Sequence, residues 1–169
     1  MLVPANNDAL RDALEALEHM RLTWEEHAQG IEQLRPVHAH SIRFVSGRRD
    51  ETCALFALSL TDQAEYREIA LRDIYAGEHF MHWVMPRLTE IAAPTPDCLV
   101  QYFAGDEWKH VGVMQSASRV ESKWGTFARF THELHEVPAS YGERLAFYVR
   151  PAPAESLALF LDYADSATH

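Results

Sequence analysis

The sequence predicts a single α+β domain in which several helices precede a small antiparallel sheet. Its 169 residues suit one domain, and a hydrophobic content of 47% is typical of a chain that buries a core. Apolar residues recur at helical spacing through the N-terminal half of the chain. From position 98 onward, short runs of β-prone residues separated by turns take over. Helices first and strands later favour segregated layers.

The N-terminal segment is expected to contain two helices. The first begins at Asn7 or Asp8, either of which is a suitable cap, and runs to about Met20. The second begins near Thr23 and ends at Pro36, because proline cannot continue a helix. Both present leucine, isoleucine or tryptophan side chains on one face.

The middle of the chain is expected to be a strand followed by more helix. Residues 37–47 alternate weakly, and a turn follows over 47–50. A helix over 52–60 is capped by Asp50 or Thr52, and a longer helical stretch continues over 61–93.

The C-terminal part is expected to form the sheet and one last helix. The predicted strands cover residues 98–103, 108–115, 119–124 and 143–149, and the helix covers 154–164. The chain then divides into an N-terminal helical segment with the first strand (1–46), a core (47–153) and a C-terminal helix (154–169), all in one domain.

Composition excludes several classes of function. A formal net charge of −10 repels a phosphate backbone, so neither nucleic acid nor an anionic membrane surface is an expected partner. No apolar run reaches the length that spans a bilayer, and the first residues lack the features of a secretion signal. We therefore expect a cytoplasmic protein whose two cysteines are free thiols.

Two side chains suggest thiol chemistry. Cys53 lies at the start of a predicted helix, where backbone N–H groups and the helix dipole favour the thiolate and lower the thiol pKa. His110 lies inside a predicted strand and precedes Gly112, which would allow another group to approach closely. A thiol at a helix tip facing an imidazole on a strand is the arrangement that thiol hydrolases use.

The segments around these residues resemble the NlpC-type cysteine peptidases and amidases of the papain-like superfamily. Residues 96–103 and 108–114 are similar to that family's Gly-Asp-Leu-Val and His-Val-Gly-Ile strands, and residues 52–56 are similar to its Asp-Cys-Ser-Gly-Phe helix start. The resemblance covers roughly residues 50–150. The chain departs from the family pattern beside the cysteine, at Thr52, Ala54 and Leu55, and at Pro96 before the strand.

The resemblance implies a papain-like fold and a hydrolase that acts on a peptide or small-molecule amide or ester. Cys53 would be the nucleophile and His110 the base, and Ser122, twelve positions after His110, would orient the imidazole. Residues 120–125, with His132 and residues 136–142, also resemble bacterial members of this broad fold to which no activity is assigned. No cofactor is implied.

Four further residues are expected to bind substrate beside this dyad. They are Trp108, Lys123, Trp124 and Tyr141. The aromatic members have a plain alternative role in the core, which is where such side chains are more commonly found.

Two other hypotheses remain open at this stage. One is a non-catalytic binding protein that keeps the fold, and the N-terminal helices are a candidate homodimer surface. The other is a metal protein whose ligands would come from histidine pairs: His79 with His82 on a predicted helix, His132 with His135 at the same spacing, and His38 with His40 on one strand face. None of these pairs matches a zinc motif, so we assign no metal ligand.

Overall fold

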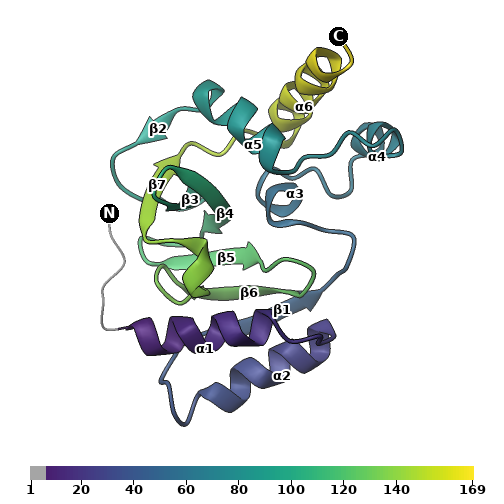
Figure 1. Cartoon of the computed structure of the whole chain (residues 1–169). Helices are drawn as coiled ribbons and strands as arrows, with labels where there is room; N and C mark the ends of the chain where they lie inside the picture. The colour runs from purple at the N-terminus through teal and green to yellow at the C-terminus, as the bar shows by residue number, and fades with distance from the viewer. Residues whose placement is uncertain (1–6) are drawn as a thin grey trace.

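The computed structural model describes residues 7–169, which form a curved seven-stranded sheet between two groups of helices (Figure 1). The helices are α1 (Asp8–Glu18), α2 (Trp24–Leu34), α3 (Cys53–Ala57), α4 (Ala64–Ala70), α5 (Glu78–Val84) and α6 (Pro153–Ala167), with 3-10 turns η2 (Met85–Arg87) and η3 (Ala139–Tyr141). The strands are β1 (Arg43–Gly47), β2 (Glu90–Ile91), β3 (Leu99–Ala104), β4 (Glu107–Met114), β5 (Arg119–Lys123), β6 (Ala128–Glu133) and β7 (Arg144–Tyr148). Their order across the sheet is β1-β6-β5-β4-β3-β7-β2, and neighbours run antiparallel. The mixed helix and sheet composition with one antiparallel sheet confirms the α+β prediction.

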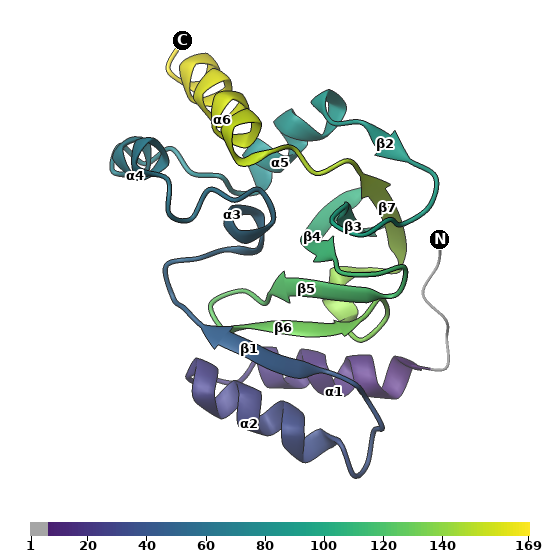
Figure 2. The ribbon, with the colours of Figure 1, turned by 180° about the vertical axis from the view of Figure 1, so that it is seen from behind.

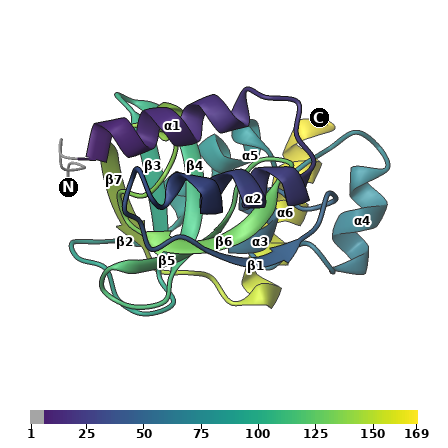
Figure 3. The ribbon, with the colours of Figure 1, turned by 90° about the horizontal axis from the view of Figure 1, so that it is seen from below.

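The sheet has a core on each side. Figures 1 and 2 both place α1 and α2 on one side of β5 and β6 and helices α3 to α6 on the other. Seen from below in Figure 3, α1 and α2 lie next to each other across the strands. We call the core under α1 and α2 the α1 side, and the core under α3 to α6 the α3 side.

Strand β3 is covered by helices on both faces, which explains why its sequence is nearly continuously apolar. Its first five residues are all buried. Val100 and Tyr102 contribute to the α1 side, whereas Leu99 and Phe103 contribute to the α3 side. A strand covered by helices on both faces has no solvent face, so its sequence does not alternate.

Strands β4 and β5 separate soon after they meet. Only two residue pairs join them, Val113 with Glu121 and Met114 with Val120. At Gly112 a side chain would collide with β5, since an added Cβ would lie 2.7 Å from Val120 Cγ1 and 3.0 Å from Ser122 Cβ. The expected close approach at Gly112 is therefore confirmed, and its neighbours are the side chains of β5.

Buried Arg11 fastens α1 to the segment before β7. Its guanidinium donates to the carbonyl oxygens of Val137 (3.1 Å), Pro138 (3.4 Å) and Gly142 (2.6 Å). These carbonyls have an N–H donor inside the protein, which offsets the cost of removing them from water.

Several boundaries differ from the sequence prediction because side chains take up local backbone groups. The predicted strand 37–47 is shortened to Arg43–Gly47, since the His40 ring bonds the Ile31 carbonyl and the Ile42 N–H and Arg35 donates to the His40 carbonyl. The predicted helix 52–60 ends early, at Ala57. Ser59 then adopts a left-handed conformation (φ 56°) that terminates it.

Two strands were not predicted. Strand β2 is only two residues long and falls inside the expected helical stretch 61–93, which the structure divides into α4, α5 and η2. Strand β6 alternates cleanly, with Ala128, Phe130 and His132 buried, but its buried histidine and charged outer residues obscure the apolar pattern. Within residues 7–169, no helix combines the length and apolar character needed to cross a bilayer.

Candidate functional site

Cys53 is the first residue of α3, as the sequence predicted. Thr52 caps the helix, because its Oγ1 accepts a hydrogen bond from the Leu55 N–H at 3.2 Å. The alternative cap, Asp50, is instead paired with Arg48, with Nε and Oδ1 2.6 Å apart. The cap fixes the direction in which the helix begins, and with it the direction of the cysteine side chain.

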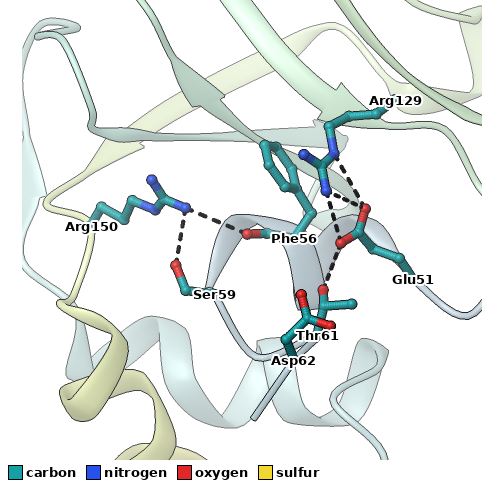
Figure 4. A pocket seen from close by; sticks show the side chains of 7 residues that line it. All are labelled: Glu51, Phe56, Ser59, Thr61, Asp62, Arg129 and Arg150. Atoms are coloured by element: carbon teal, nitrogen blue, oxygen red, sulfur yellow. Dashed lines mark hydrogen bonds and ion pairs between the residues drawn. The ribbon is translucent and has the colours of Figure 1, made fainter. Parts of the chain in front are cut away.

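A buried ion pair holds the loop that leads to Cys53. Both carboxylate oxygens of Glu51 accept hydrogen bonds from the guanidinium of Arg129 on β6, at 2.8 and 3.0 Å (Figure 4). Thr61 Oγ1 donates to the same carboxylate at 2.7 Å. The Arg129 guanidinium also lies over the Phe56 ring, 4.2 Å from its centroid. A bidentate pair with 3% exposure at Glu51 ties the start of α3 rigidly to the sheet.

The tip of α3 docks on β4 beside His110. The backbone groups of Val111, Cys53 and Ala54 act on the Cys53 thiol in the sense that lowers its pKa. Helix α3 contacts both β4 and β5, so the thiol lies where the start of the helix meets these two strands.

Burial outweighs these donors. Desolvation raises the pKa of the Cys53 thiol to about 11. The lowered pKa expected from the position at a helix start is therefore wrong for this conformation. The helix is only five residues long, and the low-polarity surroundings at β4 disfavour the charged sulfur more than the backbone donors stabilise it.

Lys123 is the charged neighbour of Cys53. It is fully buried, its Nζ donates to the Gly125 carbonyl at 2.7 Å, and it interacts electrostatically with both Glu51 and Cys53. Desolvation lowers the pKa of its ammonium to about 8. Lys123 was expected to bind substrate, and its charge interacts with the expected nucleophile. With a pKa of about 8, the ammonium is still mostly protonated at physiological pH.

His110 faces the α1 side. Its ring, 2% exposed, stacks on Tyr141 with centroids 4.3 Å apart and lies beside Tyr102. Its Nε2 is buried without a hydrogen-bond partner, and desolvation holds the pKa of the imidazole well below its ordinary value. The imidazole is neutral at physiological pH, which is the form that accepts a proton.

Tyr141 links His110 to helix α1. Its hydroxyl donates to Glu18 Oε1 at 2.8 Å. Burial raises the pKa of the Glu18 carboxyl to about 7, although the bond from Tyr141 opposes the shift. The end of α1 and the ring of Tyr141 together cover the histidine.

Ser122 bonds a different histidine from the one expected. Its Oγ lies 2.8 Å from His132 Nε2 and accepts from Trp124 Nε1 at 3.0 Å. Because His132 Nδ1 lies 2.7 Å from the Glu133 carbonyl, that nitrogen carries the proton, and Ser122 donates to Nε2. The imidazole that Ser122 orients in this structure is therefore that of His132 on the unpredicted strand β6.

The aromatic residues expected to bind substrate are buried. Trp108 lies on the α3 side and donates from Nε1 to Gln101 Oε1 at 2.6 Å, whereas Trp124 and Tyr141 lie on the α1 side. All three are at most 8% exposed. In this conformation they form the walls of the two cores.

Cys53 packs against the α3-side core, whereas the His110 ring packs against Tyr102 and Tyr141 on the α1 side. The structure thus brings the start of α3 to β4 without joining the two side chains. The hydrogen bonds among the described residues include none between the Cys53 sulfur and the His110 ring. With a thiol pKa of about 11 and an imidazole pKa well below normal, moving the proton from sulfur to nitrogen is uphill by several kcal/mol. The resting site is closed and neutral.

Sequence reasoning missed Glu51 as an anchor and Glu18 as the partner of Tyr141. Glu51 and Arg129 are 78 positions apart, and Glu18 and Tyr141 are 123 apart. Sequence patterns between neighbouring residues cannot predict contacts over such separations.

Metal ligation finds no support in the described part of the chain. No group of three or more histidine, cysteine, aspartate or glutamate side chains comes together there as a metal ion would require. His79 and His82 are exposed on α5, and His132 is committed to Ser122.

Comparison of the chain with protein-family models, with curated proteins and with solved structures gives no match.

Proposed function

We propose that this chain is a papain-like, thiol-dependent hydrolase or acyl transferase in which Cys53 is the nucleophile and His110 the base. The proposal depends on one observation above all: helix α3, which begins at Cys53, packs against β4, the strand that carries His110. A thiol at a helix tip, set against a central antiparallel strand that carries an imidazole, is the arrangement such enzymes need.

Chemistry on this site would begin with a proton transfer. An imidazole nitrogen of His110 takes the Cys53 proton, and the thiolate attacks the carbonyl carbon of an amide or ester. The carbon–sulfur bond forms and the carbonyl oxygen becomes an oxyanion, for which the Cys53 N–H is a nearby donor. The imidazolium then protonates the leaving nitrogen or oxygen, and its bond to carbon breaks. Water, deprotonated by the same imidazole, releases the acid from the thioester.

The electrostatics of the closed site require an opening step before this chemistry. Desolvation is the largest influence on both the thiol and the imidazole, and it disfavours the ion pair. Entry of substrate or water between α3 and the diverging strands β4 and β5 would remove that penalty. Lys123 would then stabilise the thiolate, since its ammonium already interacts with the sulfur.

Acyl transfer to Cys53 can be tested with a simple activated ester. On incubation with p-nitrophenyl acetate, the intact chain should release p-nitrophenol in a burst, and mass spectrometry should find the acetyl group on Cys53. Cys53→Ala should abolish the burst, whereas the matched control Cys98→Ala should retain it, since Cys98 lies in the α1-side core. His110→Asn should slow acylation by about a hundredfold or more if His110 is the base.

A second candidate, a non-catalytic binding protein on the same fold, is favoured by the raised thiol pKa and the unpartnered neutral imidazole. It predicts the opposite result in the same experiment. In the folded wild-type chain, Cys53 would then be acylated no faster than Cys98. Its acylation would also be no faster than in His110→Asn, and this result would reject the hydrolase in favour of the binding protein.

A further inference from the structure

A large cavity lies on the side of α3 that faces α4, away from the sheet (Figure 1). Its volume is about 690 Å³, within the range of small-molecule sites. Figures 1 and 2 show α4 standing out beyond α3, at a distance from the strands. Thr52 and Leu55 line the cavity from α3, and Tyr66 and Ala70 line it from α4.

The walls of this cavity are mainly apolar. They include Leu55, Tyr66, Ala70, Leu71, Tyr75 and Ala76. Leu71 and Tyr75 are 87% and 55% exposed at its mouth, although both are large hydrophobic side chains. The left-handed turn at Asp73 (φ 63°) brings the chain back after α4, so that Tyr75 and Ala76 close one wall. Concentrated apolar surface of this kind marks a place where a ligand is bound.

One cation at the rim has no partner within residues 7–169. Of the two arginines that line the cavity, Arg67 is bonded to Asp62 and to the Thr61 carbonyl. Arg49 has no carboxylate within ion-pair distance among the described residues and makes no hydrogen bond there. Asp50 also lines the cavity, and its carboxylate is neutralised by a bidentate pair with Arg48.

The cavity also offers a hydroxyl donor. Tyr66 accepts a hydrogen bond from the Ala76 N–H at 3.3 Å, and no described residue accepts the proton of its hydroxyl. A site with apolar walls, one free guanidinium and one phenolic donor matches an apolar chain that ends in a single carboxylate.

We propose that this cavity binds an aliphatic carboxylate, with its chain against Leu55, Ala70 and Leu71 and its headgroup on Arg49. The proposal is independent of thiol chemistry, because the cavity lies on another side of α3 from the Cys53 sulfur. A carboxylate is favoured over an uncharged ligand because an unpaired arginine at an apolar rim otherwise gains nothing from its position.

Calorimetric titration of the intact chain with decanoate tests the proposal, with decan-1-ol as the uncharged analogue. Wild-type protein should bind decanoate about tenfold or more tightly than the alcohol, since a charge-assisted hydrogen bond contributes about 1.5–3 kcal/mol. Arg49→Gln should weaken decanoate binding by a similar factor and leave the alcohol unaffected. Arg21→Gln, which removes an exposed arginine from the turn between α1 and α2, is the matched control and should bind as wild type.

A second variant tests the cavity itself. Ala70→Trp fills it from α4 and should abolish binding of both ligands while circular dichroism stays unchanged. Equal affinity for acid and alcohol, wild-type affinity in Arg49→Gln, or no binding of decanoate at all would overturn the proposal. So would sedimentation showing a dimer that Ala70→Trp dissociates, because the cavity would then be occupied by a second copy of the chain.

Discussion

The cores on the two sides of the sheet differ in their content of buried histidines. On the α3 side, Phe80 packs against Trp83, Phe160 and Tyr163 in a cluster of rings that contains no histidine. The α1 side holds three buried histidines, His27, His110 and His132, among its aromatic residues. The ring cluster on the α3 side is stabilised mainly by apolar burial, whereas the stability of the α1 side also depends on keeping its imidazoles neutral.

The histidines of the α1 side are also unequally satisfied. His132 has partners on both ring nitrogens, His110 lacks one at Nε2, and His27 lacks partners on both. His27 lies flat on Phe127, with centroids 3.9 Å apart and planes 2° from parallel. An unpaired buried polar atom costs free energy, so this side gives up stability to hold polar groups near the candidate dyad.

The largest effect is expected from a cavity on the α3 side. Phe80→Ala removes a ring with no exposed surface and should lower the free energy of unfolding by about 3–5 kcal/mol. The loss, measured by urea denaturation, should be the same at pH 8 and pH 5, because the rings that Phe80 contacts belong to phenylalanine, tryptophan and tyrosine, which do not titrate in that range. Leu71→Ala, at an exposed position, is the control and should change little. A strongly pH-dependent loss in Phe80→Ala would contradict the separation of the two sides.

The α1 side should lose stability in acid. Desolvation lowers the pKa of His27 to about 4, so the unfolded chain takes up this proton first as the pH falls below about 6.5. The free energy of unfolding is therefore unaffected by protonation of His27 above that pH. As the pH falls towards 4, it decreases by about 3 kcal/mol because of His27 alone. Glu18, whose pKa is raised to about 7, acts with the opposite sign and reduces the net change.

Substituting His27 isolates its share of the acid effect. His27→Phe keeps the stack on Phe127 and removes the titrating ring, so unfolding free energies measured from pH 7 to pH 4 should fall less steeply than in wild type. His79→Phe changes an exposed histidine on α5 and should leave the wild-type slope. Parallel slopes for wild type and His27→Phe would show that His27 is not the source.

A smaller effect is expected where one hydroxyl serves two partners. Ser122→Ala leaves His132 Nε2 without a donor and Trp124 Nε1 without an acceptor, at a cost of about 1–3 kcal/mol. Thermal or urea unfolding followed by tryptophan fluorescence measures it, with exposed Ser118→Ala as the control. A change no larger than the control would mean that neither hydrogen bond stabilises the fold.

Local sequence patterns predicted the parts of the fold that depend on neighbours in the chain. The helices α1, α2 and α6, the strands β3, β4, β5 and β7, the end of α2 before Pro36 and the cap at Thr52 all follow from residues close in sequence. Buried strand β3 was found because both of its faces are apolar.

Other features depend on residues that only the fold brings together. The pKa of the Cys53 thiol is raised by packing against β4, which the position at a helix start does not encode. The partner of Ser122 is His132, on a strand that was not predicted. For the candidate site, the sequence predicted that Cys53 begins a helix and that His110 lies on a strand, whereas the side of the sheet that each side chain faces and its protonation state required the three-dimensional structure.

The position of Arg11 gives α1 a role in the integrity of the whole sheet. A shortened chain that began at β1 would leave three carbonyl oxygens between residues 137 and 142 without their guanidinium donor. It would also deprive Tyr141 of its Glu18 acceptor and open one core to water. Helix α1 therefore completes the α1-side core, and its contacts join the N-terminal part of the described chain to the segment before β7.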